Sequence, residues 1–262
     1  MLSKGAVVVV AVLVAVVQAA LIRDLSPEQI GRLSNWKEGD KQNVWEVSGQ
    51  YQGDIVLNQK QRNGLIHEVY RWPDNEVPYE FDPSLSEEHK KHIAESVKIF
   101  EQVSCVKARP KRPEDGNYIY ITNEPSGCWS YVGRQSGKQI VNFQDYPVGE
   151  GCFRSATIQH EFLHAIGFYH QQSSTERDDF VEIVWKNIKK GTESNFDKYD
   201  ADEITNFGEK YDYGSVMHYG EYAFSDNGEK TIVPKDPNAE IGQRVGLSPI
   251  DIAKLNKMYG CQ

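Results

Sequence analysis

HEFLHAIGFYH, residues 160–170, is the most informative stretch of this 262-residue chain because it predicts a metal site on one helix. His160 and His164 are four residues apart, so on a helix their imidazoles lie on one face and can bind the same metal ion. Gly167 tolerates a positive φ, which lets the helix end and the chain turn back, so that His170 becomes a third ligand. Three protein ligands with one open position are typical of a catalytic zinc rather than a structural one.

Glu161 follows the first histidine and is not spaced to join the ligands. A carboxylate beside a metal site can accept a proton from the water that attacks a substrate. For a bare H-E-x-x-H, the alternative is a pair of surface histidines that flank a glutamate. Gly167 and His170 extend the pattern to H-E-x-x-H-x-x-G-x-x-H, which resembles the motif of the metzincin class of zinc endopeptidases.

SVMHY, residues 215–219, is similar to the methionine turn that accompanies this motif in metzincins. Met217 would form an apolar floor beneath the three imidazoles, although a methionine alone is as often ordinary core. Tyr219 makes the stretch resemble the astacin family in particular. That resemblance implies that the phenolic oxygen of Tyr219 is an additional zinc ligand, which leaves the metal to stabilise the transition state by a hydrogen bond.

Three further segments extend the astacin resemblance over nearly the whole chain. RWPDNEVPY (71–79) resembles the start of the mature enzyme, and IGQRVGLSPIDIAKLNKMYGC (241–261) resembles its end. CWSYVGRQSGKQIV (128–141) is similar to the strand region that lines the family's cleft. The resemblance implies an α+β fold of two lobes with zinc at the base of the cleft. A twisted sheet and helices would form the upper lobe, and the lower lobe would be largely irregular.

Local patterns also favour an α+β chain. Apolar residues between positions 85 and 103 recur at helical spacing, and residues 117–122 and 139–143 are rich in β-formers. Ser248 followed by Pro249 predicts the N-cap and first residue of a C-terminal helix.

The N-terminus predicts a secretory signal peptide, residues 1–19. Lys4 precedes a short apolar run, residues 6–17, and small residues follow it, so we expect cleavage after Ala19 or Ala20. The run is too short for a comfortable membrane span, and an uncleaved signal anchor is the alternative. We therefore expect a secreted, extracellular protein whose mature form has no membrane span.

Residues 20–62 are expected to form a propeptide and residues 63–262 one catalytic domain. The propeptide contains YQGDIVL, residues 51–57, which resembles the F-x-G-D element of astacin zymogens. By that resemblance Asp54 binds the zinc in place of the catalytic water, whereas a Gly-Asp turn in a linker is the alternative. Activation would then require a trypsin-like protease that cuts after Arg62.

Four cysteines in a secreted chain indicate two disulfides, and the sequence alone allows three pairings. The alternative of a cysteine zinc site lacks a C-x-x-C pair. The astacin resemblance implies the pairs Cys105–Cys261 and Cys128–Cys152.

Two more positions bear on the expected enzyme. Arg244 is a candidate for the pocket after the cut bond, where it would favour acidic side chains, and its alternative role is a structural ion pair. Gln171 directly follows the third histidine, where the family has a glutamate that interacts with the buried mature N-terminus. A neutral amide still accepts a hydrogen bond, but the loss of charge would weaken its pairing with an ammonium group.

These observations predict a zinc metalloendopeptidase that binds one Zn²⁺ per subunit and hydrolyses internal bonds of protein or peptide substrates. We expect a monomer, and the net charge of −9 argues against a nucleic-acid partner. The alternative is a secreted binding or matrix protein that keeps the fold with little catalysis. The complete set of site residues, Glu161 included, favours the enzyme.

Overall fold

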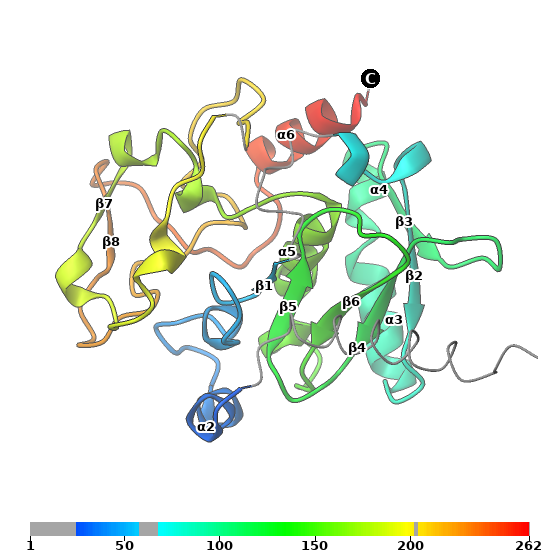
Figure 1. Cartoon of the computed structure of the whole chain (residues 1–262), viewed down its shortest axis with the longest axis horizontal. Coiled ribbons are helices and arrows are strands. Elements are labelled where there is room, and N and C mark those ends of the chain that lie inside the picture. Colours follow the sequence, from blue (N-terminus) through cyan, green and yellow to red (C-terminus); the bar gives the residue numbers. More distant parts are fainter. Residues whose placement is uncertain (1–24, 58–67, 202–203, 262) are drawn as a thin grey trace, which may run out of the picture.

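The computed structural model describes residues 25–57, 68–201 and 204–261 (Figure 1). The expected signal peptide, residues 1–19, and the expected cut after Arg62 lie outside the described residues. Within these ranges no helix has both the length and the apolar character needed to cross a bilayer.

One six-stranded sheet forms the centre of one half of the molecule. Its strand order is β1–β5–β6–β4–β2–β3, and every neighbouring pair is parallel except β5 with β6, which is antiparallel. The strands are β1 (Ile55–Val56), β2 (Glu76–Phe81), β3 (Lys107–Pro110), β4 (Tyr118–Thr122), β5 (Cys128–Tyr131) and β6 (Lys138–Phe143). Strands β4 and β6 confirm the two segments that are rich in β-formers.

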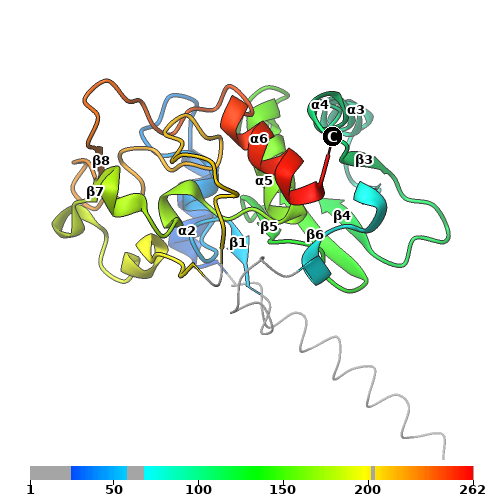
Figure 2. The same ribbon diagram turned by 90° about the horizontal axis from the view of Figure 1, so that it is seen from above.

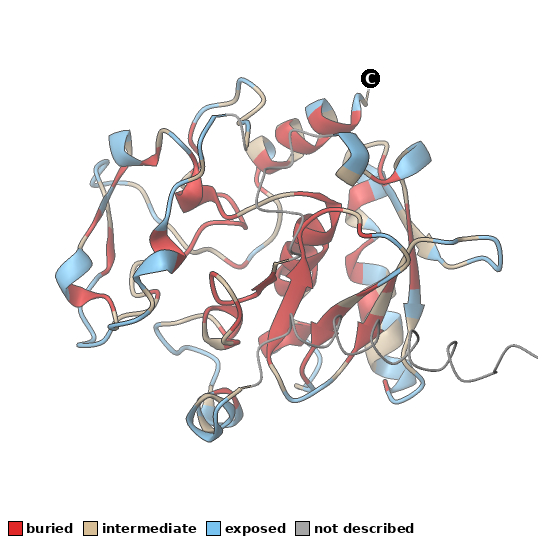
Figure 3. Cartoon of the chain, viewed as in Figure 1, coloured by how far each residue is buried: buried red, intermediate tan, exposed pale blue. Residues whose placement is uncertain are grey.

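Helices α3 (Glu87–Ser96) and α5 (Ser155–Ile166) lie on the same face of this sheet (Figure 2). Helix α5 packs on β5 and β6, and α3 packs beside it. The helical pattern from 85 to 103 is divided, because α3 ends at Ser96 and α4 (Ile99–Val103) begins three residues later. The division still leaves the apolar positions of both helices in the core, which Figure 3 shows running through α5 and the neighbouring strands.

The other half of the molecule is largely irregular, as expected. Its one sheet within the described residues pairs β7 (Val181–Ile183) with β8 (Ile232–Pro234), and α6 (Pro249–Tyr259) then returns the chain to α5 (Figure 1). Ser248 caps α6 in a capping box, as its position before Pro249 predicts. Short 3-10 helices are Trp45–Val47, Glu68–Tyr70, Pro73–Asn75, Gly151–Phe153, Gln171–Ser173, Arg177–Asp179, Trp185–Asn187 and Glu193–Phe196. The α+β class is confirmed.

Both expected disulfides are confirmed. Cys105–Cys261 joins the C-terminal end of α6 to the segment between α4 and β3, across a sequence separation of 156. Cys128–Cys152 joins β5 to the turn before α5, across a separation of 24. Both bonds therefore fix elements that surround α5.

Residues 25–57, called the N-terminal segment below, lie between the sheet and the irregular half (blue in Figures 1 and 2). The Ser48 hydroxyl contacts β5, and the backbone of Gln52 contacts Asn195 in the irregular half. The segment begins with α2 (Pro27–Asn35), a helix that the sequence analysis did not predict. Its signal was present in the sequence, because Ser26 and Gln29 form a capping box around a proline at the first turn.

Candidate zinc site

The end of α5 determines where the third histidine lies. Gly167 ends the helix with φ 132°, and a Cβ at this position would come within 2.6 Å of the Met258 methyl group. A side chain here is therefore disfavoured by the backbone conformation, and Met258 would also have to shift to make room for it. The last carbonyls of α5 accept hydrogen bonds from the Trp72 indole (at Ala165, 2.8 Å) and the Tyr259 hydroxyl (at Ile166, 2.7 Å).

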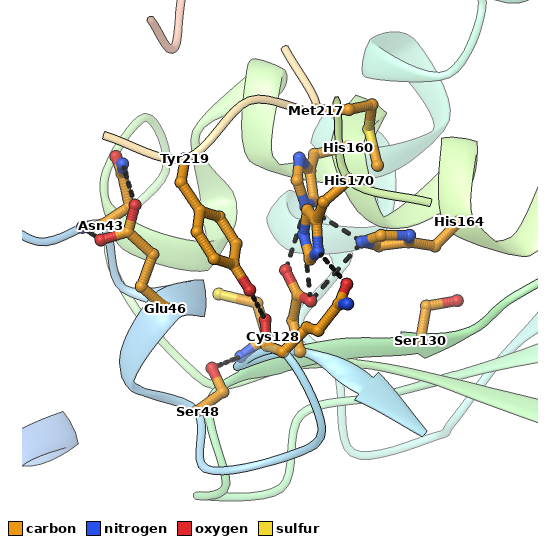
Figure 4. Close-up of polar contacts among 12 residues, drawn as sticks. Asn43, Glu46, Ser48, Cys128, Ser130, His160, His164, His170, Met217 and Tyr219 are labelled. Carbon is orange, nitrogen blue, oxygen red and sulfur yellow. Dashed lines mark hydrogen bonds and ion pairs between the residues drawn. The ribbon is translucent and has the colours of Figure 1, made fainter. Parts of the chain in front are cut away.

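The three histidines of the motif converge on one buried point (Figure 4). Asp54 reaches the same point. One ligand atom from each of the four side chains lies within 4.8 Å of the others. The Asp54 carboxylate lies 3.0 Å from Nε2 of His160, 3.5 Å from Nε2 of His164 and 3.3 Å from Nε2 of His170. The structure thus brings Asp54 to the histidine motif at residues 160–170, a contact that the sequence predicts only through the family resemblance.

Hydrogen bonds at the other ring nitrogen orient each imidazole for metal binding. Nδ1 of His160 lies 2.8 Å from the carbonyl of Val216, and Nδ1 of His164 lies 2.7 Å from that of Phe168. Nδ1 of His170 lies 3.0 Å from the side-chain oxygen of Gln52. Since an oxygen of this kind can only accept, each Nδ1 carries the proton and each Nε2 presents a lone pair.

The donor set fits a zinc ion. Burial lowers the pKa of His160 to about 3 and that of His170 to about 4, so both rings are neutral, as ligands must be. Nε2 of His160 and Nε2 of His164 are 3.1 Å apart although neither carries a proton. Two nitrogens on one tetrahedral zinc are about 3.3 Å apart at ordinary bond lengths. The three histidines therefore form a site for one zinc ion.

Glu161 lies on α5 beside these ligands and is not one of them. Both of its carboxylate oxygens are buried and have no hydrogen-bond partner among the described residues. Burial, and after it the charge of Asp54, raise the pKa of Glu161 well above its usual range, whereas Arg244 opposes the shift. A buried carboxylate without a partner costs stability, which is typical of a functional group rather than a structural one.

The methionine turn lies beside the imidazoles (Figure 4). Met217 is buried, and its carbonyl accepts a 3.0 Å hydrogen bond from the backbone N–H of Gln171, the residue after the third ligand. Tyr219 is fully buried, and its hydroxyl donates a 2.6 Å hydrogen bond to the carbonyl of Gln52. In this structure the phenol therefore contacts the N-terminal segment.

Arg244 is buried and contacts an aromatic ring of the N-terminal segment. Its guanidinium lies 4.4 Å from the centroid of Trp45, and one of its nitrogens donates to the carbonyl of His218 (3.2 Å). Nε of Arg244 has no hydrogen-bond partner among the described residues, and both roles given for Arg244 stay predictions. Burial lowers the pKa of Arg244 to about 10, and the carboxylate of Glu46 is the largest charge that opposes this shift.

Gln171 has a partner that the sequence did not suggest. Its side-chain oxygen accepts a 2.6 Å hydrogen bond from Nζ of Lys254 on α6. Both side chains are buried, and burial lowers the pKa of Lys254. The neutral amide is thus fully compatible with the local packing, since it accepts from an ammonium group that is already present.

Sequence reasoning missed three residues of the site, all in the N-terminal segment. Trp45 stacks on the rings of His160 (centroids 4.5 Å apart) and His170 (5.2 Å). Glu46 is buried, and its Oε1 accepts from the backbone of Gly220 (3.0 Å). Gln52 contacts both the third histidine and Tyr219. The apolar cluster of Val44, Trp45 and Val47, in a segment that is otherwise rich in polar residues, was an available signal.

Comparisons with known proteins agree with this geometry. The family model described as Astacin, a family of peptidases, matches residues 65–260. Seminal metalloprotease 1 of Drosophila melanogaster is 43% identical over 221 residues, which cover 82% of this chain and 88% of that protein. Zinc metalloproteinase nas-13 of Caenorhabditis elegans is 42% identical over 201 residues, which cover 77% of this chain and 43% of that protein. The chain therefore spans less than half the length of that relative.

A solved structure extends the similarity to the fold. High choriolytic enzyme 1, a hatching enzyme zinc-protease from Oryzias latipes, is 34% identical, with a TM-score of 0.67 over 73% of this chain and 94% of that one. Its fold, the family model and the histidine cluster all lead to one assignment. The chain belongs to the astacin family of zinc metalloproteinases.

Proposed function

We propose that the protein is a secreted zinc endopeptidase that is made as a latent zymogen. The observation that carries the proposal is the buried cluster of three Nε2 lone pairs around the Asp54 carboxylate, with the unpartnered carboxylate of Glu161 beside it. The Asp54 carboxylate lies among the three zinc-ligand nitrogens, where it competes for the position that a reactive water would need. Asp54 is then the inhibitory ligand, and Glu161 is the catalytic base.

The chemistry follows from the residues around that point. Zinc, when bound by the three histidines, supplies a Lewis acid that polarises water and the scissile carbonyl. Glu161, which has no other hydrogen-bond partner among the described residues, accepts the proton of the attacking water and delivers it to the leaving amine. Once the N-terminal segment has left, the hydroxyl of Tyr219 loses Gln52 as its acceptor and can donate to the developing oxyanion.

The outer edge of β5 is the proposed site for the substrate backbone. Its backbone N–H groups at Cys128 and Ser130 donate 2.9 Å hydrogen bonds to the Ser48 hydroxyl and the Asp54 carbonyl of the N-terminal segment. Alternate N–H groups on one edge are what an extended peptide requires for pairing. Removal of the segment would free both donors. Backbone pairing of this kind tolerates many sequences, which suits an endopeptidase that acts on proteins.

Arg244 is the proposed determinant of side-chain preference beside the cut bond. In this structure Glu46 of the N-terminal segment supplies the largest negative charge acting on it, and the same carboxylate accepts from the backbone of Gly220. Departure of Glu46 would leave the Gly220 N–H and a buried guanidinium without that carboxylate. A substrate with an acidic side chain at this place would restore both interactions.

The arrangement of the whole chain completes the proposal. Residues 1–19 act as a signal peptide, residues 20–62 as a propeptide and residues 63–262 as the catalytic domain. A trypsin-like cut between Arg62 and Asn63 begins activation. The mature enzyme works outside the cell as a monomer.

Cleavage of a protein substrate by the purified chain, before and after a limited trypsin cut at Arg62, tests this function. Activity should appear only after the cut, and a zinc chelator or Glu161→Ala should abolish it. A properly cut protein with one bound zinc and no activity would contradict the proposal. In that case the chain would be a binding protein that retains the fold, and Gln171→Glu would be the first variant to test for restored activity.

Peptide substrates that differ only in the side chain beside the cut bond test the role of Arg244. Arg244→Gln should lower the ratio of kcat/KM for acidic over neutral side chains by at least about tenfold, because a hydrogen bond to a charged group is lost. Arg112→Gln is the matched control, since this exposed arginine pairs with Glu76 instead. An unchanged ratio in Arg244→Gln would exclude the proposed pocket.

A further inference from the structure

The second half of the N-terminal segment is buried as deeply as the core of the domain that it covers. Ten of its residues have at most 2% of their surface exposed, namely Leu33, Val44, Trp45, Glu46, Ser48, Gln50, Gln52, Asp54, Ile55 and Val56. Nine of the ten lie between residues 44 and 56, and burial concentrated in so short a stretch is typical of a tightly held peptide rather than of a linker.

The first group of contacts anchors α2 and the residues after it. The Tyr146 hydroxyl donates to the carbonyl of Leu33 (2.7 Å), and the Tyr146 ring packs edge-on against Trp36 with centroids 5.8 Å apart. Glu38 forms an ion pair with Arg154. These contacts lie outside the zinc site and do not depend on Asp54.

The second group covers the zinc ligands. Trp45 is fully buried between two imidazoles and the Arg244 guanidinium, an arrangement that combines aromatic stacking with a cation–π contact. Large aromatic side chains in such central, desolvated positions contribute most of the affinity in protein interfaces. Trp45 therefore acts as an anchor that is separate from Asp54.

The third group pairs backbone with backbone and with a buried amide. Strand β1 adds to the edge of β5 in parallel, with Ile55 opposite Ser130 and Val56 opposite Tyr131. The N–H of Gln52 donates to the Asn195 side chain (2.9 Å). All three groups of contacts lie between residues 25–57 and the rest of the described chain, so a cut between residues 62 and 63 breaks none of them.

We propose that the N-terminal segment remains bound after the chain is cut at Arg62, as a separate peptide that still covers the zinc site. This inference rests on the proposed function, because it describes how the activation cut takes effect. Activation then has two steps, which are the cut and the departure of the peptide. The departed peptide is also an inhibitor of other copies of the enzyme, since it recognises the same surface on each of them.

The direct test follows the fragment rather than the activity. The full, zinc-loaded chain is cut at Arg62, and the product is passed through a gel-filtration column in native buffer and analysed by mass spectrometry. We expect the fragment that ends at Arg62 to elute with the enzyme and to separate only on dilution. Specific activity should rise with dilution and fall again when the fragment is added back. A fragment that separates at once at high protein concentration would overturn the inference.

Variants of the segment show which contacts retain it. Trp45→Ala should weaken retention about 30-fold, as for a central interface anchor. Ile30→Ala is the matched control, because Ile30 is 43% exposed on α2 and should leave retention unchanged. Equal retention of both variants would show that Trp45 is not an anchor.

The experiment distinguishes failure of the retention proposal from failure of the proposed function. Co-elution is measured without any substrate, so it tests retention even in the Glu161→Ala variant. If the fragment-free protein shows no Glu161-dependent activity, the proposed function fails while the retention result stands. If the cut protein is fully active at once with no fragment bound, the proposed function stands and the inference of retention fails.

Discussion

Tyr219 illustrates how much of this site depends on single polar atoms. Burial raises the pKa of Tyr219 well above its usual range, so the phenol stays protonated and remains a hydrogen-bond donor. Its hydroxyl donates to the carbonyl of Gln52, which belongs to the N-terminal segment. In the proposed mechanism this donor becomes available to a substrate once the N-terminal segment has left.

Tyr219→Phe should lower kcat of the activated enzyme by about 100-fold, the usual effect of removing one donor to an oxyanion. The measurement is steady-state kinetics with the zinc content determined in the same samples. Tyr213→Phe is the matched control, because its hydroxyl donates to the carbonyl of Phe180 and not to the site. Unchanged kcat in Tyr219→Phe at full zinc content would contradict the proposed role.

The ion pairs at the β3 edge of the sheet make the stability of the fold depend on pH. Two hydrogen bonds from the Arg109 guanidinium hold the pKa of Asp115 well below its usual range. A carboxylate whose folded-state pKa is depressed stabilises the fold above its unfolded pKa of about 3.9, and this contribution is lost as the pH falls further. Asp115→Asn should therefore lower the free energy of unfolding at pH ~6, and its difference from the wild type should shrink below about pH 4.

Urea unfolding over the range from about pH 3 to about pH 6 measures this difference. Glu114→Gln is the control, because its exposed side chain neighbours Asp115 in sequence, whereas the Arg109 ion pair belongs to Asp115. A difference for Asp115→Asn that grows as the pH falls would have the wrong sign for a paired carboxylate.

At the scale of elements, the C-terminal helix holds the zinc site together from outside. Asp251 on α6 accepts hydrogen bonds from the Ser215 hydroxyl (2.6 Å) and the Val216 backbone (2.9 Å). The carbonyl of Val216 in turn accepts the hydrogen bond from Nδ1 of His160. The orientation of a ligand on α5 thus depends on a helix that begins only at Pro249, near the other end of the chain.

The two disulfides should contribute unequally to stability. In the chain-entropy model, closing the loop between Cys105 and Cys261 contributes about 5 kcal/mol, whereas the shorter loop between Cys128 and Cys152 contributes about 3.5 kcal/mol. Replacing each pair by alanines and measuring unfolding by denaturant compares the two, with each pair as the control for the other. A larger loss of stability for the shorter loop would contradict this order.

At the scale of the whole molecule, the candidate zinc site joins three parts of the chain. Asp54 comes from the N-terminal segment, two histidines come from α5, and His170 lies beyond the turn that begins the irregular half. A ligand that binds only when these parts are together stabilises the assembled fold.

Removal of zinc should therefore lower the melting temperature of the uncut chain. Binding at a zinc concentration about 1,000 times the dissociation constant stabilises the folded state by about 4 kcal/mol. Thermal unfolding in the presence of a chelator, and then with increasing zinc, measures the effect. His170→Ala should melt at a temperature that responds much less to zinc, and a wild-type melting temperature independent of zinc would contradict the prediction.

The parts of this protein that depend on local spacing can be predicted from the sequence. Two histidines four residues apart on a helix face the same side in any fold, and a glycine three residues later permits the turn to a third. The N-cap of α6 at Ser248 and the strands β4 and β6 were predictable for the same reason. The division of the helical pattern into α3 and α4 was not, because the apolar spacing continues across the break.

The residues that contact the zinc ligands from distant parts of the sequence become visible only in the folded chain. The contact of His160 with Asp54 spans 106 residues, and that of Tyr219 with Gln52 spans 167. Trp45 carries no motif, and its place against two imidazoles depends on how the N-terminal segment packs between the two halves. Local spacing fixes which way neighbouring side chains point, whereas contacts over such distances follow from the packing of the whole chain, which no short pattern encodes.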